Sequence, residues 1–336
     1  MVLGLRTDGN SYTDDGNNLG RTLSPRLALS YSLSPRFNLN ASFGRYYKIA
    51  PYTILGYKEE GVAVNKDMPY IQSDHLVAGI EYTPTNATRI TLEGFRKWYD
   101  NYPVSQRRGI SMANLGGDFG VFGNERVLGV GLGRTYGVEF TVQQQLVKNI
   151  YGILAYTWFY SEFTGTDREK FLPSGWDTRH LVSFTGGYKF PRNWEVGIRF
   201  RYQGMAPATP WDEFASLENY PFTGQGVLDD GRINSLRLES FNAMDLRVDK
   251  KWNFRKWSLN LFLDIQNLYN SLNPVQPGFT LQRNADGSIA TRDGSPYNPG
   301  DYNDLSAPNN RQSAIPVILS QDSGARLPSI GFVVGF

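Results

Sequence analysis

The last seven residues of the chain, 330–336, place a large apolar side chain at every second position. Ile330, Phe332, Val334 and Phe336 share one face of an extended strand, and the residues between them are two glycines and a valine. Successive side chains of a strand point to opposite sides of a sheet, so the segment predicts a strand with one face suited to oily surroundings. A strand of a soluble sandwich can show the same alternation, although an exposed apolar edge strand would promote association between chains.

The same period of two recurs along the chain, and no helical pattern of useful length competes with it. The clearest segment is 194–203, in which aromatic and aliphatic residues alternate with glycine, charged residues and glutamine. Further apolar stripes lie at 27–31, 76–82, 182–190, 244–248 and 257–265. The sequence therefore predicts an all-β protein in which most strands have one apolar and one polar face.

Composition excludes several classes of protein and leaves this one open. The 336 residues contain no cysteine and carry a formal net charge of +2, so neither a disulfide framework nor a nucleic-acid partner is indicated. Mean hydropathy is −0.41, and no apolar run approaches the roughly 20 residues of a membrane helix. A search for continuous apolar runs does not detect transmembrane barrels, because the apolar residues of their strands are spaced two apart. Aromatic residues make up 14% of the chain, which suits a barrel with two aromatic girdles.

The connections between the predicted strands alternate strictly between short and long. Short turns are predicted at 34–36, 83–87, 147–149, 191–193 and 253–255. Long loops are predicted at about 8–22, 48–71, 103–128, 162–177, 208–239 and 270–325. Outer-membrane barrels have short turns at one end and long loops at the other, whereas sandwiches with Greek-key crossovers do not sort their loops in this way. We count about 12 antiparallel strands in an up-and-down order.

The seven tryptophans fit the same arrangement. Trp194, Trp252 and Trp257 lie beside short turns, and the other four, Trp98, Trp158, Trp176 and Trp211, lie at or beyond the opposite strand ends. Indole rings favour the boundary between membrane and water. We therefore expect no tryptophan in the middle of a strand.

Several phrases resemble those of one family, the TonB-dependent outer-membrane receptors, and most closely the receptors of Bacteroidetes-type bacteria. They are 23–26 (LSPR), 43–51 (FGRYYKIAP), 92–100 (LEGFRKWYD), 133–140 (GRTYGVEF), 176–180 (WDTRH), 264–270 (DIQNLYN) and 328–336 (PSIGFVVGF). The resemblance implies an antiparallel up-and-down transmembrane β-barrel of about 22 strands, filled by a plug domain. On this interpretation residues 1–336 are the C-terminal part of the barrel, with about 12 of the expected 22 strands. Ile330, Phe332, Val334 and Phe336 would then be the signal read by the barrel-assembly machinery.

The resemblance also implies a function and partners. Such a receptor lies in the bacterial outer membrane and takes up a scarce nutrient, such as a siderophore, cobalamin, an oligosaccharide or a peptide. Its partners would be outer-membrane lipid, the plug domain and the remaining barrel strands, the nutrient ligand, and the TonB–ExbB–ExbD complex acting through the plug. Because the chain as written has no export signal and starts partway through the pattern, we expect a barrel fragment. The alternatives are a self-closed 12-stranded passive pore, an outer-membrane hydrolase and a soluble β-protein.

Two groups of residues are candidates for function. Charged residues on the polar strand faces are expected to face the lumen and the plug, or to form a solvated pore wall: Arg26, Arg89, Glu93, Glu139, Glu195, Arg199, Arg201, Asp245, Arg247, Asp249 and Asp264. Aromatic residues of the long loops are expected to capture ligand, or to pack within the loops: Trp211, Tyr220, Phe222, Tyr297 and Tyr302.

Other motifs have simpler explanations. His75 and His180 show no partners at catalytic or metal-ligand spacing, so we expect no enzyme, no metal site and no cofactor. The glycines at 129–133 resemble a nucleotide-binding stretch, but they lead into a strand, so close packing or a bulge explains them better. Aspartates in the loops (Asp14, Asp15, Asp286, Asp293, Asp301 and Asp304) could bind calcium, but turn formation accounts for them as well.

Overall fold

The computed structural model describes residues 1–13, 16–116 and 123–336. The chain divides into two units. Unit 1 comprises Met1–Ala206, Glu239–Leu272 and Gly324–Phe336, and unit 2 comprises Pro207–Leu238 and Asn273–Ser323. Each unit is described separately below.

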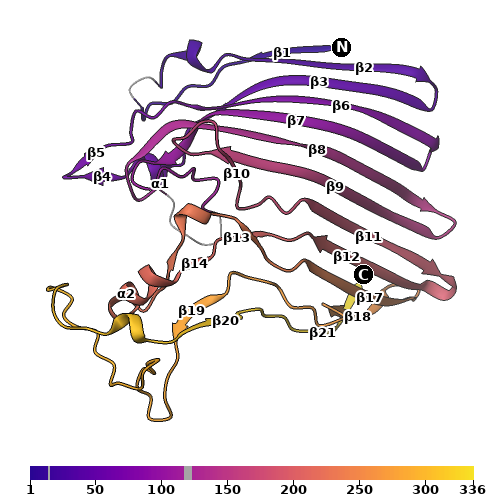
Figure 1. Ribbon diagram of the computed structural model, residues 1–336. Helices are drawn as coiled ribbons and strands as arrows, with labels where there is room; N and C mark the ends of the chain where they lie inside the picture. Colours follow the sequence, from indigo (N-terminus) through magenta and orange to yellow (C-terminus); the bar gives the residue numbers. More distant parts are fainter. Residues whose placement is uncertain (14–15, 117–122) are drawn as a thin grey trace. The chain divides into compact units, whose positions relative to one another are not determined.

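Unit 1 is one large antiparallel sheet whose strands follow one another in chain order (Figure 1). Its order is β1 (Val2–Arg6), β2 (Ser24–Ser34), β3 (Phe37–Lys48), β6 (Ile71–Thr85), β7 (Thr88–Ser105), β8 (Val127–Val147), β9 (Ile150–Thr164), β11 (His180–Phe190), β12 (Trp194–Gln203), β17 (Phe241–Asn253), β18 (Ser258–Gln266) and β21 (Leu327–Gly335). The short β10 (Phe171–Pro173) pairs with β9 outside this path. The predicted count of about 12 strands and the up-and-down order are confirmed. Within the described residues, β1 and β21 each pair with one strand only, so the sheet is open.

The five predicted short turns join neighbouring strands at one end of this sheet. The turn between β8 and β9 contains two residues, as do those at 35–36 and 86–87; it consists of Lys148 and Asn149, whose φ angles are 48° and 71°. Positive φ at both central residues gives the turn a twist that matches the twist of the strands, which is why asparagine is common there. The turn between β11 and β12 is a short helix, η2 (Pro191–Asn193).

The long loops lie at the opposite end and contain most of the remaining short elements of unit 1. These are η1 (Leu19–Thr22), α1 (Tyr52–Leu55), β4 (Lys58–Glu59) and β5 (Val62–Ala63). Two predicted loops include residues outside the described part of the chain, at 14–15 and 117–122. In the ranges that the structure describes, no helix is both long and apolar enough to cross a membrane.

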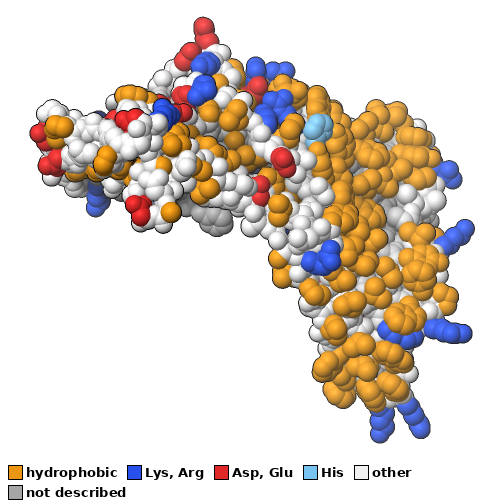
Figure 2. All heavy atoms as spheres, turned by 60° about the horizontal axis from the view of Figure 1, so that its bottom comes forward, with side chains coloured by type: hydrophobic (Ala, Val, Ile, Leu, Met, Phe, Trp, Pro, Cys, Tyr) orange, Lys and Arg blue, Asp and Glu red, His pale blue; other side chains and the backbone are white. Residues whose placement is uncertain are grey.

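The strand register collects the apolar residues on one face of the sheet. Leu39 pairs with Ile80, Ile80 with Leu92, and Leu92 with Phe140, so one apolar row crosses four strands. Leu92 is 48% exposed and Ile80 is 46% exposed. Such values mean that no second layer of the described residues covers these side chains. Figure 2 shows this surface near the short turns, with Lys and Arg side chains along its margin.

The tryptophans correct one expectation. Trp98 lies inside β7 and Trp158 inside β9, so these two are not at strand ends. The reason is that β7, β8 and β9 continue beyond the apolar part of the sheet by several residues. The indoles lie at the end of the apolar stripe, whereas the strands themselves end several residues later.

Unit 2 consists of one helix and several short hairpins around a small core. Its elements are β13 (Pro207–Ala208), β14 (Trp211–Asp212), α2 (Glu213–Thr223), β15 (Val227–Leu228), η3 (Asp230–Arg232), β16 (Leu236–Arg237), β19 (Gly278–Leu281), η4 (Arg311–Ser313) and β20 (Pro316–Leu319). The Asp212 carboxylate accepts a hydrogen bond from the Ala215 N–H at 2.9 Å and caps α2. The core contains Leu217, Phe279, Leu281 and Ala314.

Candidate functional site: a polar wall and an aromatic pocket

The face opposite the apolar one carries the charged residues singled out in the sequence. The register places all eleven on it, and it pairs Glu93 with Glu139, Glu195 with Asp249, Arg199 with Asp245, and Arg247 with Asp264 directly across strands. Arg26, Arg89 and Arg201 lie on the same face of β2, β7 and β12. Their assignment as residues that face a lumen and a plug stays a prediction.

From β12 to β18 these side chains form two ion-paired groups, together called the polar wall. The Arg199 guanidinium donates to Asp245 at 2.7 Å, and Arg201 lies 3.5 Å from the same carboxylate. On the next strand pair Arg247 donates to Asp249 at 2.8 and 3.0 Å and lies 4.0 Å from Asp264. Every carboxylate in the polar wall thus has a cationic neighbour, which limits the cost of bringing these charges together.

The polar wall extends sideways through neutral and cationic donors. The Tyr151 hydroxyl donates to Glu195 at 2.5 Å, and the Asn260 amide donates to Asp249 at 2.7 Å. Lys189 lies 4.0 Å from Glu195. Nearer the N-terminus, Arg89 donates to Glu81 at 2.7 Å, so ion pairing also occurs at β6 and β7.

Among the residues that the structure describes, Glu93 and Glu139 have no cationic partner. They lie directly opposite each other on β7 and β8. Two carboxylates in register repel each other and raise the free energy of the folded sheet. A hydrogen-bond donor or a cation from another segment would relieve the repulsion between these two carboxylates.

A pocket of about 600 Å³ lies on the same face at the loop end of unit 1. Its lining comes from β3, α1, β6, β7, β9 and the loops between them: Tyr46, Tyr47, Lys48, Pro51, Ile54, Ile71, Ser73, His75, Tyr99, Tyr102, Pro103, Met112, Gly116, Phe163 and Trp176. Tyr46 pairs with Ser73, and Ser73 with Tyr99, so these residues form one row across three strands. No periodicity in the sequence predicts this pocket, although tyrosines are dense in two of its segments, 43–51 and 92–102.

The aromatic rings of the pocket contact one another. Ring centroids of Tyr99 and Phe163 are 5.2 Å apart, and those of Tyr102 and Phe163 are 4.5 Å apart. Trp176 packs edge-on against Phe163 at 6.0 Å. At the other side of the pocket the His75 ring lies 4.7 Å from Tyr46 and its Nε2 lies 2.6 Å from the Ser73 hydroxyl. Such a lining can stack against a planar or apolar ligand and offers a few polar groups to orient it.

Gly133 makes room for this packing. A Cβ at Gly133 would lie 2.3 Å from the Phe163 ring, closer than any real contact. The register between β7 and β8 also shifts at Tyr102, opposite Gly131. Close packing at a bulge, which the sequence predicted for these glycines, therefore agrees with the structure, and the segment is part of β8.

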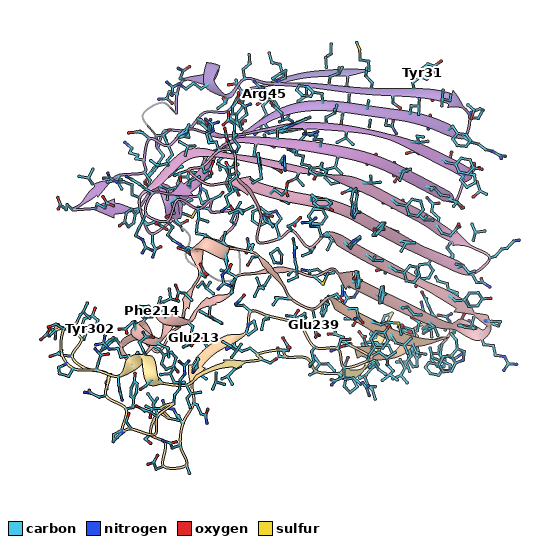
Figure 3. All side chains as sticks on the ribbon, in the orientation of Figure 1. Tyr31, Arg45, Glu213, Phe214, Glu239 and Tyr302 are labelled. Atoms are coloured by element: carbon cyan, nitrogen blue, oxygen red, sulfur yellow. The ribbon has the colours of Figure 1, made fainter. Side chains whose placement is uncertain are left out.

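The five aromatic residues of the predicted ligand loops lie in unit 2. Trp211 donates to the Pro277 carbonyl at 3.1 Å and packs on Phe279, and the Tyr220 hydroxyl lies 2.9 Å from that of Thr280. Tyr297 packs against the core, and Phe222 contacts Tyr302 at 5.3 Å. Tyr302 is 68% exposed and Figure 3 shows it on an outlying loop. Packing within unit 2 accounts for Trp211, Tyr220 and Tyr297. A role of the five aromatic residues in binding ligand stays a prediction.

The remaining polar residues singled out in the sequence form hydrogen bonds with nearby groups of their own unit. His180 Nδ1 lies 2.9 Å from the Tyr156 hydroxyl. Asp286, Asp293 and Asp304 each accept a backbone N–H two residues further on, which is the turn chemistry expected of aspartate. Asp14 and Asp15 lie outside the described residues. Among the described residues, no three His, Asp or Glu side chains are close enough together to hold a metal ion.

An open antiparallel sheet with one apolar face, one charged face, short turns at one end and long loops at the other is the wall of a membrane-barrel type of protein. The model of the family described as TonB dependent receptor-like, beta-barrel, matches residues 1–268. The chain therefore belongs to this family. A comparison with curated proteins gives no match.

Solved structures with a similar fold include several receptors. The ferric-catecholate import receptor Fiu from E. coli K12 has a TM-score of 0.56 at 13% identity, over 93% of this chain and 35% of the receptor. The ferric citrate transporter FecA gives 0.55 at 14% identity, over 93% and 38%. The siderophore receptor PiuA from Acinetobacter baumannii gives 0.54 at 12% identity, over 93% and 36%. The chain thus spans little more than a third of the length of these proteins.

Proposed function

We propose that the chain is part of the barrel wall of an outer-membrane TonB-dependent transport receptor for a scarce nutrient. The observation that carries the proposal is the division of the open sheet into an apolar and a charged face. In a membrane the backbone N–H and C=O groups of such strands form their hydrogen bonds with the neighbouring strands, and the apolar side chains contact lipid. The polar wall then borders an aqueous interior.

The proposed partners follow from groups that the chain leaves open. The single-paired strands β1 and β21 would pair with the remaining barrel strands. The facing carboxylates of Glu93 and Glu139 would accept donors from a plug domain, and the polar wall would supply further contacts. The TonB–ExbB–ExbD complex would act through that plug. No covalent chemistry is required, so we propose a transporter and no enzyme.

The aromatic pocket is the proposed place of first ligand contact within unit 1. The similar solved structures are named for ferric-catecholate, ferric citrate and siderophore transport, which makes an iron chelate the first ligand class to test. Cobalamin, an oligosaccharide or a peptide are the other classes of the proposal. The rings of Tyr46, Tyr99 and Tyr102 are chemically suited to each of these.

Replacing Tyr99 by Ala is expected to weaken binding of the transported nutrient about tenfold, because one ring that lines the pocket is lost. The measurement is a binding titration and a radiolabelled uptake assay with the receptor in its own outer membrane. The matched control is Tyr136→Ala, since Tyr136 stacks on Tyr160 on the apolar face at 5.4 Å. Equal binding by the two variants would contradict a ligand role for the pocket.

The same assay separates the transporter from a self-closed passive pore. Uptake through the proposed receptor requires TonB and the proton-motive force, whereas a pore conducts ions across a planar bilayer without either. TonB-independent conductance by the chain alone would favour the pore.

The terminal phenylalanine tests the proposed assembly signal. Phe336 is fully exposed and its removal takes away no packing within the chain. Deleting Phe336 is nevertheless expected to lower the amount of heat-modifiable receptor in the outer membrane several-fold, because the assembly machinery would lose a recognition group. Val333→Ala, on the polar face of the same strand, serves as the control. An unchanged receptor level after the deletion would refute the assembly role.

A further inference from the structure

The loop end of the apolar face carries an unexpected row of four charged residues and one tryptophan. Five positions that pair directly across neighbouring strands, β3, β6, β7, β8 and β9, make up this row, here called the arginine row: Arg45, Asp74, Trp98, Arg134 and Glu162. The row is offset by one residue from Tyr46, Ser73 and Tyr99 of the aromatic pocket. The two therefore lie at the same level of the strands on opposite faces of the sheet.

The position of the arginine row matches the edge of a bilayer. On β3 the apolar-face residues run from Phe37 through Leu39, Ala41 and Phe43 before Arg45. Eight residues of extended strand span about 27 Å, or about 20 Å along the axis of a barrel whose strands tilt by about 40°. The apolar band of outer-membrane barrels is about 25 Å tall. Figure 3 shows Arg45 toward the loop end of the sheet and Tyr31 near its turn end.

Two arginines of the row are held in place by carboxylates. Arg45 donates Nε and Nη2 to the two oxygens of Asp74, at 2.7 and 2.8 Å, and Tyr47 is a further side-chain hydrogen-bond partner of Arg45. Arg134 donates Nε to Glu162 at 2.8 Å, and its guanidinium lies 4.2 Å from the Phe171 ring centroid. Because a guanidinium has several N–H donors in a fixed plane, such a pair can still bind a second anion.

Arg96 is the residue without such a partner. It lies one step nearer the turns, on the apolar face of β7, and its guanidinium is 5.0 Å from the Trp98 ring centroid. Within the described part of the chain, no carboxylate lies at ion-pair distance from Arg96. Its side chain is exposed on a face that is otherwise apolar at this level. An arginine there is stable only if its head reaches water or an anion at the bilayer surface.

A pocket of about 360 Å³ lies beside these groups, lined by Gln72, Asp74, Arg96, Trp98, Tyr99, Asp100, Leu132, Gly133, Arg134 and Phe171. Asp100 has its own cation, Arg168, at 3.6 Å. Counting Arg45, Arg96, Arg134 and Arg168 against Asp74, Asp100 and Glu162 leaves one positive charge in excess. That excess lies at Arg96, where an anion meets the fewest competing carboxylates.

We propose that Arg96 and the arginine row bind the phosphate of an anionic lipid headgroup in the outer leaflet. Guanidinium groups match the geometry of phosphate oxygens, and Trp98 supplies the ring that orients Arg96 at headgroup level. The lipid chains then lie along the apolar rows of β3, β6 and β7. The inference rests on the proposed outer-membrane location, because only there does this face meet lipid.

The test uses the purified receptor in phosphatidylcholine nanodiscs that contain a small fraction of phosphatidic acid. Native mass spectrometry counts the phosphatidic acid molecules that stay bound. Arg96→Gln is expected to lower this number about fivefold, and Lys97→Gln to leave it unchanged. Lys97 is the matched control because it is the next residue of β7, on the opposite face.

The outcomes separate the possible explanations. Equal loss in both variants, or no loss in either, would overturn the inference. Displacement by excess inorganic phosphate would also overturn it, because the site would then recognise the free anion. Thermal unfolding and the heat-modifiable band of Arg96→Gln report whether the variant still folds; if it does not, Arg96→Lys, which keeps the charge, must restore lipid retention. A receptor that does not insert into nanodiscs would refute the proposed membrane location, whereas one that inserts without preference for phosphatidic acid would refute this inference alone.

Discussion

Replacing Arg311 by Met is expected to destabilise unit 2 by about 3 kcal/mol. The Arg311 side chain is 2% exposed and donates to Glu218 at 2.8 Å, and its guanidinium also bonds the Pro299 carbonyl. Removing one partner of a buried pair leaves the other uncompensated, which costs about 3–5 kcal/mol. Because Glu218 is 34% exposed, water can partly solvate it and the lower value applies.

Hydrogen exchange of the amides in 207–238 and 273–323 measures this effect as the free energy of local opening. The matched control is Arg292→Met, because Arg292 also joins this loop to α2 through Glu213 but both side chains are more than half exposed. The control is expected to cost about 0–1 kcal/mol. Similar exchange rates in the two variants would refute the importance of burial at Arg311.

The same pair predicts a pH dependence. Hydrogen bonds from Gln312 and Arg311 lower the pKa of Glu218 below its ordinary value. A carboxylate with a lowered pKa in the folded state stabilises that state above its unfolded pKa of about 4.3, and this stabilisation is lost as the pH falls through the folded value. Amide protection in unit 2 should therefore fall on acidification below about pH 4.3, and less so in Arg311→Met.

Replacing Leu92 by Arg is expected to destabilise the membrane-inserted receptor by about 2–4 kcal/mol. Leu92 lies well inside the apolar face, in a row with Ile80 and Phe140. An arginine on the lipid face costs this much near the middle of the bilayer and much less at its edge. The measurement is a urea titration of the receptor refolded into phospholipid vesicles.

The control is Thr91→Arg, the preceding residue of β7 on the polar face, between Glu81 and Thr141. A new arginine there meets water and a carboxylate, so the stability is expected to change by less than about 0.5 kcal/mol. A larger loss of stability for Thr91→Arg than for Leu92→Arg would mean that the face of Thr91 contacts lipid, and would refute the proposed orientation.

Much of the strand architecture could be predicted because its signals are local. The turn at 147–149 and the alternation of 194–203 correctly predict β8, β9 and β12, since a strand with two different environments must alternate with a period of two. The tryptophans show where this fails. Trp98 and Trp158 lie at the end of the apolar stripe, but hydrogen bonding between the strands continues past them. The alternation of apolar and polar residues does not predict where a strand ends.

The candidate sites depended on information that a single segment does not contain. Lys97 and Trp98 are neighbours in sequence, yet one belongs to the polar face and the other to the arginine row. The sequence indicated the face of each residue but not its partners. Trp211 and Tyr220 were candidates for ligand capture on their exposure in a predicted loop, and the core of unit 2 accounts for their packing.

Alternation and turn chemistry by themselves determined the antiparallel sheet, its twelve-strand path and which residues share a face, because each depends on contacts within a few residues. Register decided the rest. Whether Arg45 meets Asp74, or Tyr99 meets Phe163, depends on how far neighbouring strands are shifted along each other, and that shift is set by pairing energies summed over whole strands.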